Sequence, residues 1–87
     1  MLGEAISRLK NILKNYPGHP TASLALAEAL TRQGNYSEAV EHYRVLLKGK
    51  PDLITAVMAG YNTVLEACPE QVLARAYLGE AFLAQNK

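Results

Sequence analysis

The stretch His19–Pro51 reads HPTASLALAEALTRQGNYSEAVEHYRVLLKGKP and decides the fold of this chain. Its first half is rich in alanine and leucine, its middle is the turn Gln33-Gly34-Asn35, and its second half carries another set of apolar residues. A glycine suits the left-handed residue that ends many helices. Turns of two to five residues join antiparallel helices. The stretch therefore predicts one helical hairpin.

The prolines of the chain set a spacing for this hairpin. Pro17 and Pro51 stand 34 residues apart, and a helical unit with a period of this length is typical of stacked repeats rather than of an enzyme pocket. Pro69 follows Pro51 by only 18 residues, about half a period. The sequence therefore predicts one regular unit, with an irregular segment after it.

Apolar spacing extends the helical prediction along the chain. Before the hairpin, apolar residues recur at three- and four-residue intervals, as on one face of a helix; they are Leu2, Ile6, Leu9, Ile12 and Leu13. Alternation typical of strands is never sustained, so no strand is expected. The helices are expected at residues 2–15, 21–33, 36–48, about 53–67 and about 70–86.

Residues at the expected helix starts predict how each helix is capped. Asn35 followed by Glu38 resembles a capping box for the third helix. Asp52 is expected to cap the fourth helix. Pro69 is expected in the first turn of the fifth, where its missing N–H costs nothing.

Composition limits the classes of protein to consider. The 87 residues allow one domain, 49% of them are hydrophobic, and the net charge of +1 offers no general attraction to nucleic acid or to an acidic membrane surface. No apolar run approaches the roughly 20 residues of a membrane span. The N-terminus lacks a signal-peptide pattern. The compartment stays unknown, with the cytoplasm favoured. A single cysteine excludes an internal disulfide.

Residues 20–53 resemble a tetratricopeptide repeat, a 34-residue helix–turn–helix unit of α-solenoids. The matching positions are Leu26, Ala27 and Leu30 in the first helix, Gly34 and Tyr36 at the turn, and Ala39, Tyr43 and Pro51 in the second half. Ser23 and Leu46 depart from the bulky and small residues usual at their positions. Small residues at Ala27 and Ala39 are expected to let the two helices approach closely, and Tyr43 to fill the gap to a neighbouring unit.

The resemblance implies an all-α fold, a right-handed solenoid of stacked antiparallel helical hairpins with about five helices. On this reading residues 1–87 form a single domain. Residues 2–15 are a half repeat, 20–53 the clear repeat and 54–87 a degenerate repeat. An alternative is that residues 71–86 begin another repeat, because LARAYLGEAFLAQNK reads like a first helix. Antiparallel alternation favours the first division.

Candidate reactive residues form no catalytic set. His19 lies in the Pro-Gly-His-Pro turn, and His42 is expected to pair with Glu38 four residues before it. A metal site would need a third ligand, and no spacing motif supports one. Cys68 has no paired cysteine or histidine near it in sequence and is expected to be an inert, partly buried thiol. We therefore expect a protein that is not an enzyme and that holds no cofactor or metal.

The resemblance implies a partner-binding groove lined by the first helix of each hairpin. Its expected residues are Thr21, Leu24, Glu28, Thr31, Arg32, Thr55, Met58, Asn62 and Leu65. This mixed surface suits a peptide or an amphipathic helix. One variant of the family clamps a C-terminal carboxylate with lysine, arginine and asparagine. Only Asn62 matches that variant here, so such clamping is disfavoured.

The leading hypothesis is a protein–protein interaction module that binds a peptide or helix of a partner in this groove, as part of a larger scaffold or assembly factor. The alternative is a structural segment that forms homodimers through its exposed C-terminal helix. Leu78 and Phe82 would support this alternative unless they pack on residues 53–67. Nucleic-acid binding is disfavoured by the near-neutral charge and by the scarcity of basic residues in the expected groove, where Arg32 stands alone.

Overall fold

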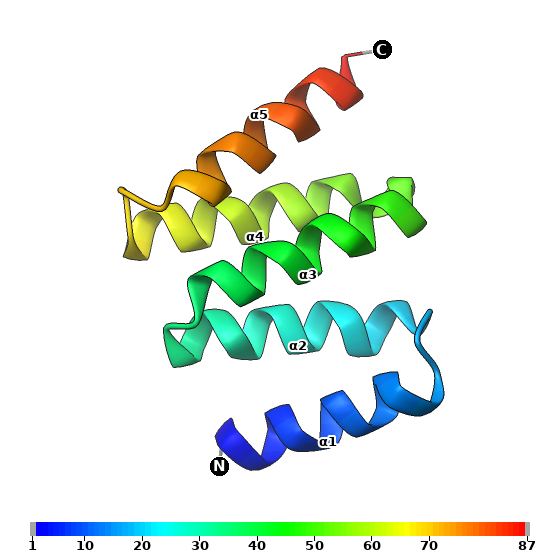
Figure 1. Ribbon diagram of the computed structural model, residues 1–87. Coiled ribbons are helices and arrows are strands. Elements are labelled where there is room, and N and C mark those ends of the chain that lie inside the picture. Colours follow the sequence, from blue (N-terminus) through cyan, green and yellow to red (C-terminus); the bar gives the residue numbers. More distant parts are fainter. Residues whose placement is uncertain (1, 87) are drawn as a thin grey trace.

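The computed structural model describes residues 2–86 and is built of helices stacked in chain order (Figure 1). The helices are α1 (Leu2–Asn15), α2 (Pro20–Gln33), α3 (Tyr36–Gly49), α4 (Ile54–Ala67) and α5 (Val72–Gln85), with a short 3₁₀ turn, η1 (Pro51–Leu53), before α4. No strand occurs among these residues. The all-α prediction of five helices is confirmed.

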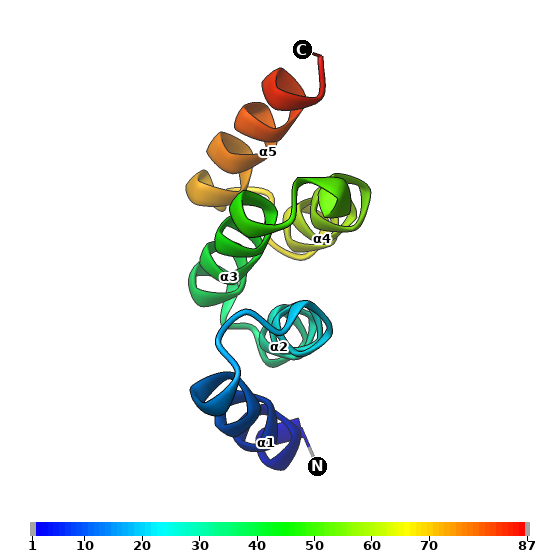
Figure 2. The ribbon, with the colours of Figure 1, turned by 90° about the vertical axis from the view of Figure 1, so that its right-hand side faces the viewer.

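The helices form two layers. Figure 2 shows α2 and α4 on one side of the stack and α1, α3 and α5 on the other. Each helix packs against the next one in the chain, and in addition α2 contacts α4 and α3 contacts α5. These contacts between alternate helices are the ones that stacked helical hairpins form.

The hairpin of α2 and α3 begins and ends on identifiable residues. The His19 imidazole caps α2, its Nδ1 accepting a hydrogen bond from the Ala22 amide at 3.1 Å, and Pro20 takes the first helical position. Gly34 ends α2 with φ of 90°, a left-handed conformation that favours glycine. Its amide donates to the Thr31 carbonyl at 3.1 Å. The expected role of Gly34 is confirmed, and the cap formed by His19 was not foreseen.

The capping box predicted at the start of α3 is wrong. Asn35 makes no side-chain cap; its Nδ2 donates instead to Gln33 Oε1 at 2.7 Å. Glu38 lies 3.4 Å from Lys10 Nζ of α1 and 3.8 Å from His42 Nε2. The carboxylate is therefore directed to Lys10 and His42 rather than back to the helix start, and the predicted pair with His42 is present.

Two further helix starts differ from the predictions. Asp52 lies within η1 and its side chain caps nothing, because α4 begins only at Ile54. Pro69 lies in the turn before α5, which begins at Val72 after a cap by Gln71, whose Oε1 accepts from the Leu73 amide at 3.3 Å. A residue before proline is biased toward extended backbone. Cys68 accordingly has φ of −141° and ψ of 84° and ends α4.

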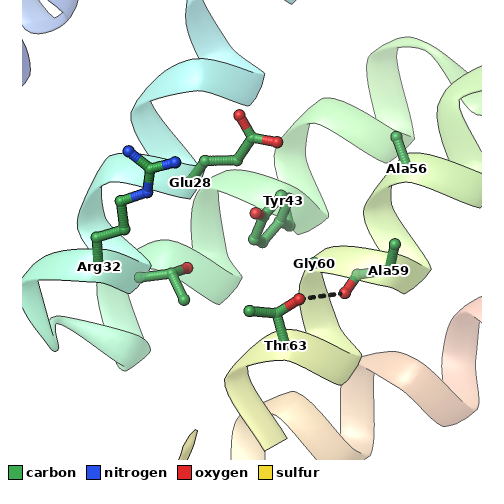
Figure 3. Close-up of a pocket in the computed structure, with 8 residues that line it drawn as sticks. Glu28, Arg32, Tyr43, Ala56, Ala59, Gly60 and Thr63 are labelled. Atoms are coloured by element: carbon green, nitrogen blue, oxygen red, sulfur yellow. Dashed lines mark hydrogen bonds between the residues drawn. The ribbon is translucent and has the colours of Figure 1, made fainter. Parts of the chain in front are cut away.

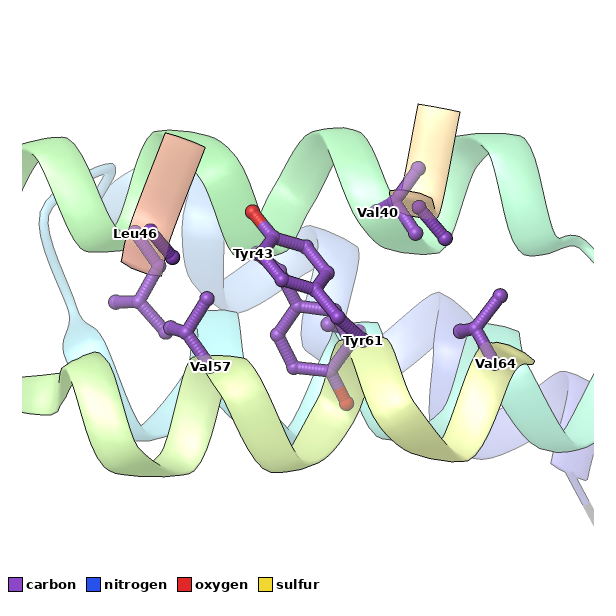
Figure 4. Close-up of a cluster of buried hydrophobic side chains, with 9 residues drawn as sticks. Val40, Tyr43, Leu46, Val57, Tyr61 and Val64 are labelled. Carbon is purple, nitrogen blue, oxygen red and sulfur yellow. The ribbon is translucent and has the colours of Figure 1, made fainter. Parts of the chain in front are cut away.

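Small residues let the helices approach one another. Ala27 of α2 and Ala39 of α3 are both completely buried, as the sequence predicted. A first core cluster joins α1 to the hairpin through Ile6, Leu26 and Leu30. The larger second cluster is centred on α3 and α4 (Figure 4); its buried members are Ala27, Val40, Tyr43, Leu46, Val57, Tyr61, Val64, Ala74 and Ala81.

Tyr43 joins the hairpin to α4. Its side chain is buried, and its ring meets Tyr61 edge-on with centroids 5.8 Å apart and planes at 78°. The tip of the ring lies against Gly60 of α4. A Cβ added at Gly60 would come within 2.6 and 2.7 Å of two carbons of the Tyr43 ring, so a larger residue would fit only if that ring moved. The predicted gap-filling role of Tyr43 is confirmed.

A mixed aromatic and polar network holds α5 against α3. The Tyr77 ring lies 6.3 Å from that of Tyr61, and its hydroxyl donates to Glu41 Oε1 at 2.7 Å. Arg44 lies over the Tyr77 ring at 4.8 Å and donates two hydrogen bonds to Glu80, at 3.1 and 3.2 Å. These hydrogen bonds favour the carboxylate form and lower the pKa of Glu80. The orientation of α5 therefore depends on side chains of α3 as well as on its contact with α4.

Candidate functional site

A hollow opens on the surface between α2 and α4 (Figure 3). Its volume is about 360 Å³, and its lining residues are Glu28, Thr31, Arg32, Tyr43, Ala56, Ala59, Gly60 and Thr63. The α4 wall consists of small residues that recur at helical spacing. Because these side chains are short, they leave space between α2 and α4 at this point. The floor includes Tyr43, so the contact that joins the two hairpins also closes the base of the hollow.

On α2, the structure brings together three of the predicted groove residues. Glu28, Thr31 and Arg32 all line the hollow. Thr21 and Leu24 lie further toward the start of α2 and line a second, smaller hollow of about 230 Å³ beside η1.

On α4, the predicted groove residues line neither hollow. Thr55 and Asn62 are exposed, whereas Met58 and Leu65 are half-buried and pack against the larger core cluster, as Leu24 does. Successive residues of a helix point about 100° apart. The side of α4 that faces α2 therefore carries Ala56, Ala59, Gly60 and Thr63. All of these except Gly60 stand next to a predicted position in the sequence. The binding role of the nine predicted residues stays a prediction.

The α4 side of the hollow had a signal in the sequence. Ala56, Ala59 and Gly60 are small residues at spacings of three and four, the pattern of one helix face. A glycine inside a helix lowers the stability of that helix, so its presence indicates that another group packs closely there. This pattern marks a place where another group approaches α4, but it does not show that the group is Tyr43.

The two threonines of the hollow present acceptors to its interior. Thr31 Oγ1 donates to the Ala27 carbonyl and Thr63 Oγ1 donates to the Ala59 carbonyl, each at 2.9 Å. Each hydroxyl therefore uses its single hydrogen within its own helix. The lone pairs of its oxygen can still accept hydrogen bonds. Thr31 is also buried, so any ligand would meet its oxygen away from bulk water.

The charged residues of the hollow lie at its α2 edge. Glu28 and Arg32 are both exposed, and neither takes part in an ion pair with another residue of the described part of the chain. The pKa of Tyr43 is raised, first by burial of its hydroxyl and then by the negative charge of Glu28, against a smaller opposing effect of the nearby Thr31 hydroxyl. The phenol therefore stays protonated at neutral pH.

The remaining candidate reactive residues have structural surroundings. His19 is the cap of α2 and His42 pairs with Glu38, while Cys68 is a half-buried free thiol. Over residues 2–86, no three histidine, cysteine, aspartate or glutamate side chains come together as metal ligands would. None of the helices in that range has the length and apolar character needed to cross a membrane.

Comparison with protein families gives the identity of the fold. The family model described as "Tetratricopeptide repeat" matches residues 2–54. The chain belongs to the tetratricopeptide repeat family. The match includes α1, the complete α2–α3 hairpin and η1, the regions interpreted above as a half repeat and a clear repeat. A comparison with curated proteins finds no match.

Membership of the tetratricopeptide repeat family carries a general function. Tetratricopeptide repeats form solenoids of helical hairpins, generally mediate protein–protein interaction and are typically non-catalytic. The family match ends at residue 54, so the reading of residues 54–87 as a degenerate repeat stays a prediction. The contacts of α4 with α2 and of α5 with α3 favour that reading over a new repeat beginning at residue 71.

Proposed function

We propose that this tetratricopeptide-repeat chain binds a peptide or helix of a partner protein along the face formed by α2 and α4, as part of a larger scaffold or assembly factor. The observation that supports the proposal is the hollow between these helices, walled by small residues on α4 and edged by Glu28 and Arg32 on α2. A volume of about 360 Å³ accommodates one side chain of a bound segment. The rest of the segment would lie along the exposed residues of α2 and α4.

The proposal is tested by filling the hollow. Ala59 is exposed and lines it, so Ala59→Arg blocks the space without disturbing the core. Peptides selected from a displayed random library on the unaltered protein should lose at least about tenfold in affinity for this variant, measured by fluorescence polarisation. The arginine would exclude the peptide side chain that enters the hollow, and losing one contact at the centre of an interface has a cost of this size. Leu24 and Met58 are less suitable for substitution because both pack against the core.

Ala5→Arg is the matched control, because Ala5 is an exposed residue of α1, outside the hollow. Its affinity for the selected peptides should be unchanged. Equal binding by both variants would place the peptide site elsewhere and refute the proposed face. Failure to select any peptide would also count against it.

A second candidate function is self-association through α5, as a structural segment. Val72 and Leu83 are 73% and 72% exposed on this helix, and Phe82 is 48% exposed, whereas Leu78 packs against the core. These exposed apolar residues, at both ends of α5, are the surface through which a second copy would bind.

Sedimentation velocity tests this second candidate. A dimer that forms through α5 should dissociate in Leu83→Glu, because a carboxylate would be buried without a partner. Val45→Glu on α3 is the control, since Val45 is 70% exposed outside α5, and it should leave the dimer intact. An unaltered protein that sediments only as a monomer at millimolar concentration would exclude this function.

A further inference from the structure

The hollow between α2 and α4 is rich in hydrogen-bond acceptors. Thr31 and Thr63 have already donated their hydroxyl hydrogens to carbonyls of their own helices. Glu28 contributes a carboxylate, which only accepts when ionised. Tyr43 adds a phenol oxygen at the floor. Arg32 at the edge is the only cationic side chain among the lining residues.

We propose that the hollow receives a lysine side chain of the bound partner, with its ammonium group at Glu28, Thr31 and Tyr43. This inference rests on the proposed function and names the chemistry of the residue that is recognised. An ammonium is a compact charge with three donors and no acceptor, which complements a set of oxygens. The methylene stem of lysine would lie against the small apolar wall of Ala56, Ala59 and Gly60.

The position of Glu28 supports a cationic occupant. Glu28 and Tyr43 line the same hollow, and the negative charge of Glu28 contributes, after burial, to the raised pKa of the Tyr43 hydroxyl. An anionic occupant would face Glu28 and the threonine oxygens, with Arg32 as its only attractive charge. Electrostatic complementarity of this kind decides which partners are accepted.

Arg32 modulates the same site. It follows Glu28 by four residues, the spacing at which opposite charges attract on a helix surface. Arg32 therefore competes with an incoming ammonium for the carboxylate. Removing Glu28 or Arg32 should change the affinity for a cation in opposite directions, which an effect on folding alone would not do.

The experiment uses n-butylammonium chloride as a lysine side-chain analogue and sodium butyrate as its anionic counterpart, at constant ionic strength. Two-dimensional ¹H–¹⁵N spectra should show saturable shifts of the Ala59, Gly60 and Thr63 amides with butylammonium only. Glu28→Gln should weaken this binding about tenfold, the effect of losing one charged hydrogen bond. Arg32→Gln should strengthen it about two- to threefold.

The control for the loss of charge is Glu4→Gln, an exposed carboxylate on α1 that does not line the hollow; this variant should bind butylammonium as the unaltered protein does. Saturable shifts with butyrate at the same amides would overturn the inference. So would equal butylammonium binding by Glu28→Gln and Glu4→Gln.

A second measurement separates this inference from the proposed function. Library peptides whose binding is lost in Ala59→Arg should contain a lysine, and replacing it by norleucine should weaken their binding about tenfold, again the effect of one charged hydrogen bond. Peptides that bind the face equally well with norleucine would refute the lysine site alone and leave the proposed function standing. Peptides unaffected by Ala59→Arg would refute the proposed function itself.

Discussion

Gly60→Ala should lower the free energy of unfolding by about 1–3 kcal/mol, the usual cost of overpacking a core. The added methyl group would meet the tip of the Tyr43 ring, with two ring carbons at 2.6 and 2.7 Å. The Tyr43 ring would have to shift to relieve this contact, and the shift is costly because the ring is buried against Tyr61. The direction is opposite to the general rule, since glycine to alanine inside a helix normally raises stability by up to about 1 kcal/mol.

Urea denaturation measures this effect, and the chain contains its own control. Gly79 lies inside α5, and a Cβ added there meets no atom within 4 Å. Gly79→Ala should therefore raise stability by about 0.5–1 kcal/mol. In a Tyr43→Ala background the ring is absent, so Gly60→Ala should no longer destabilise. A Gly60→Ala protein as stable as Gly79→Ala would contradict the close contact between α3 and α4.

Tyr61→Ala should have the largest effect, a loss of about 3–5 kcal/mol. Tyr61 is 1% exposed, the largest of the fully buried side chains, and lies between the rings of Tyr43 and Tyr77. Its removal leaves a cavity where α3, α4 and α5 meet. Native proteins are stable by only about 5–15 kcal/mol in total, so the variant should lose a large part of its stability.

Tyr16→Ala is the control for the loss of a tyrosine, because Tyr16 is 67% exposed, and its effect should stay within about 0.5 kcal/mol. Tyr61→Phe keeps the ring and should retain most of the stability. Thermal and urea denaturation followed by circular dichroism measure all three variants. A Tyr61→Ala protein that unfolds at the same urea concentration as Tyr16→Ala would show that the three rings do not form the centre of the core.

Most of the fold could be predicted from residues that act through the local backbone. Pro17 and Gly34 mark the end of a helix because proline lacks an N–H and glycine accepts a positive φ. The predicted caps were less successful. Glu38 was expected to bond back to its own helix start but pairs with Lys10 of α1, a residue 28 positions earlier. A local motif cannot indicate that a distant cation competes for the same carboxylate.

Three of the nine predicted groove residues, all on α2, line the hollow, and their binding role stays a prediction. Glu28, Thr31 and Arg32 were expected on the groove side of α2 and do line the hollow. On α4 none of the predicted residues lines the hollow, and other residues of the same helix face α2. The rotation of α4 depends on where Tyr43 contacts Gly60, and this contact joins residues 17 positions apart on different helices.

The sequence by itself determined that this protein is a stack of antiparallel helices. The helix ends and the apolar stripes depend on interactions within a few residues, so they can be predicted from the amino-acid sequence. The 34-residue spacing follows from the positions of those helix ends. Only the tertiary structure decided which sides of α2 and α4 face each other and which groups meet in the hollow between them. The physical reason is that a rotation of a helix by one residue leaves its local hydrogen bonds unchanged. Packing of side chains from other helices, here Tyr43 on Gly60, selects one rotation.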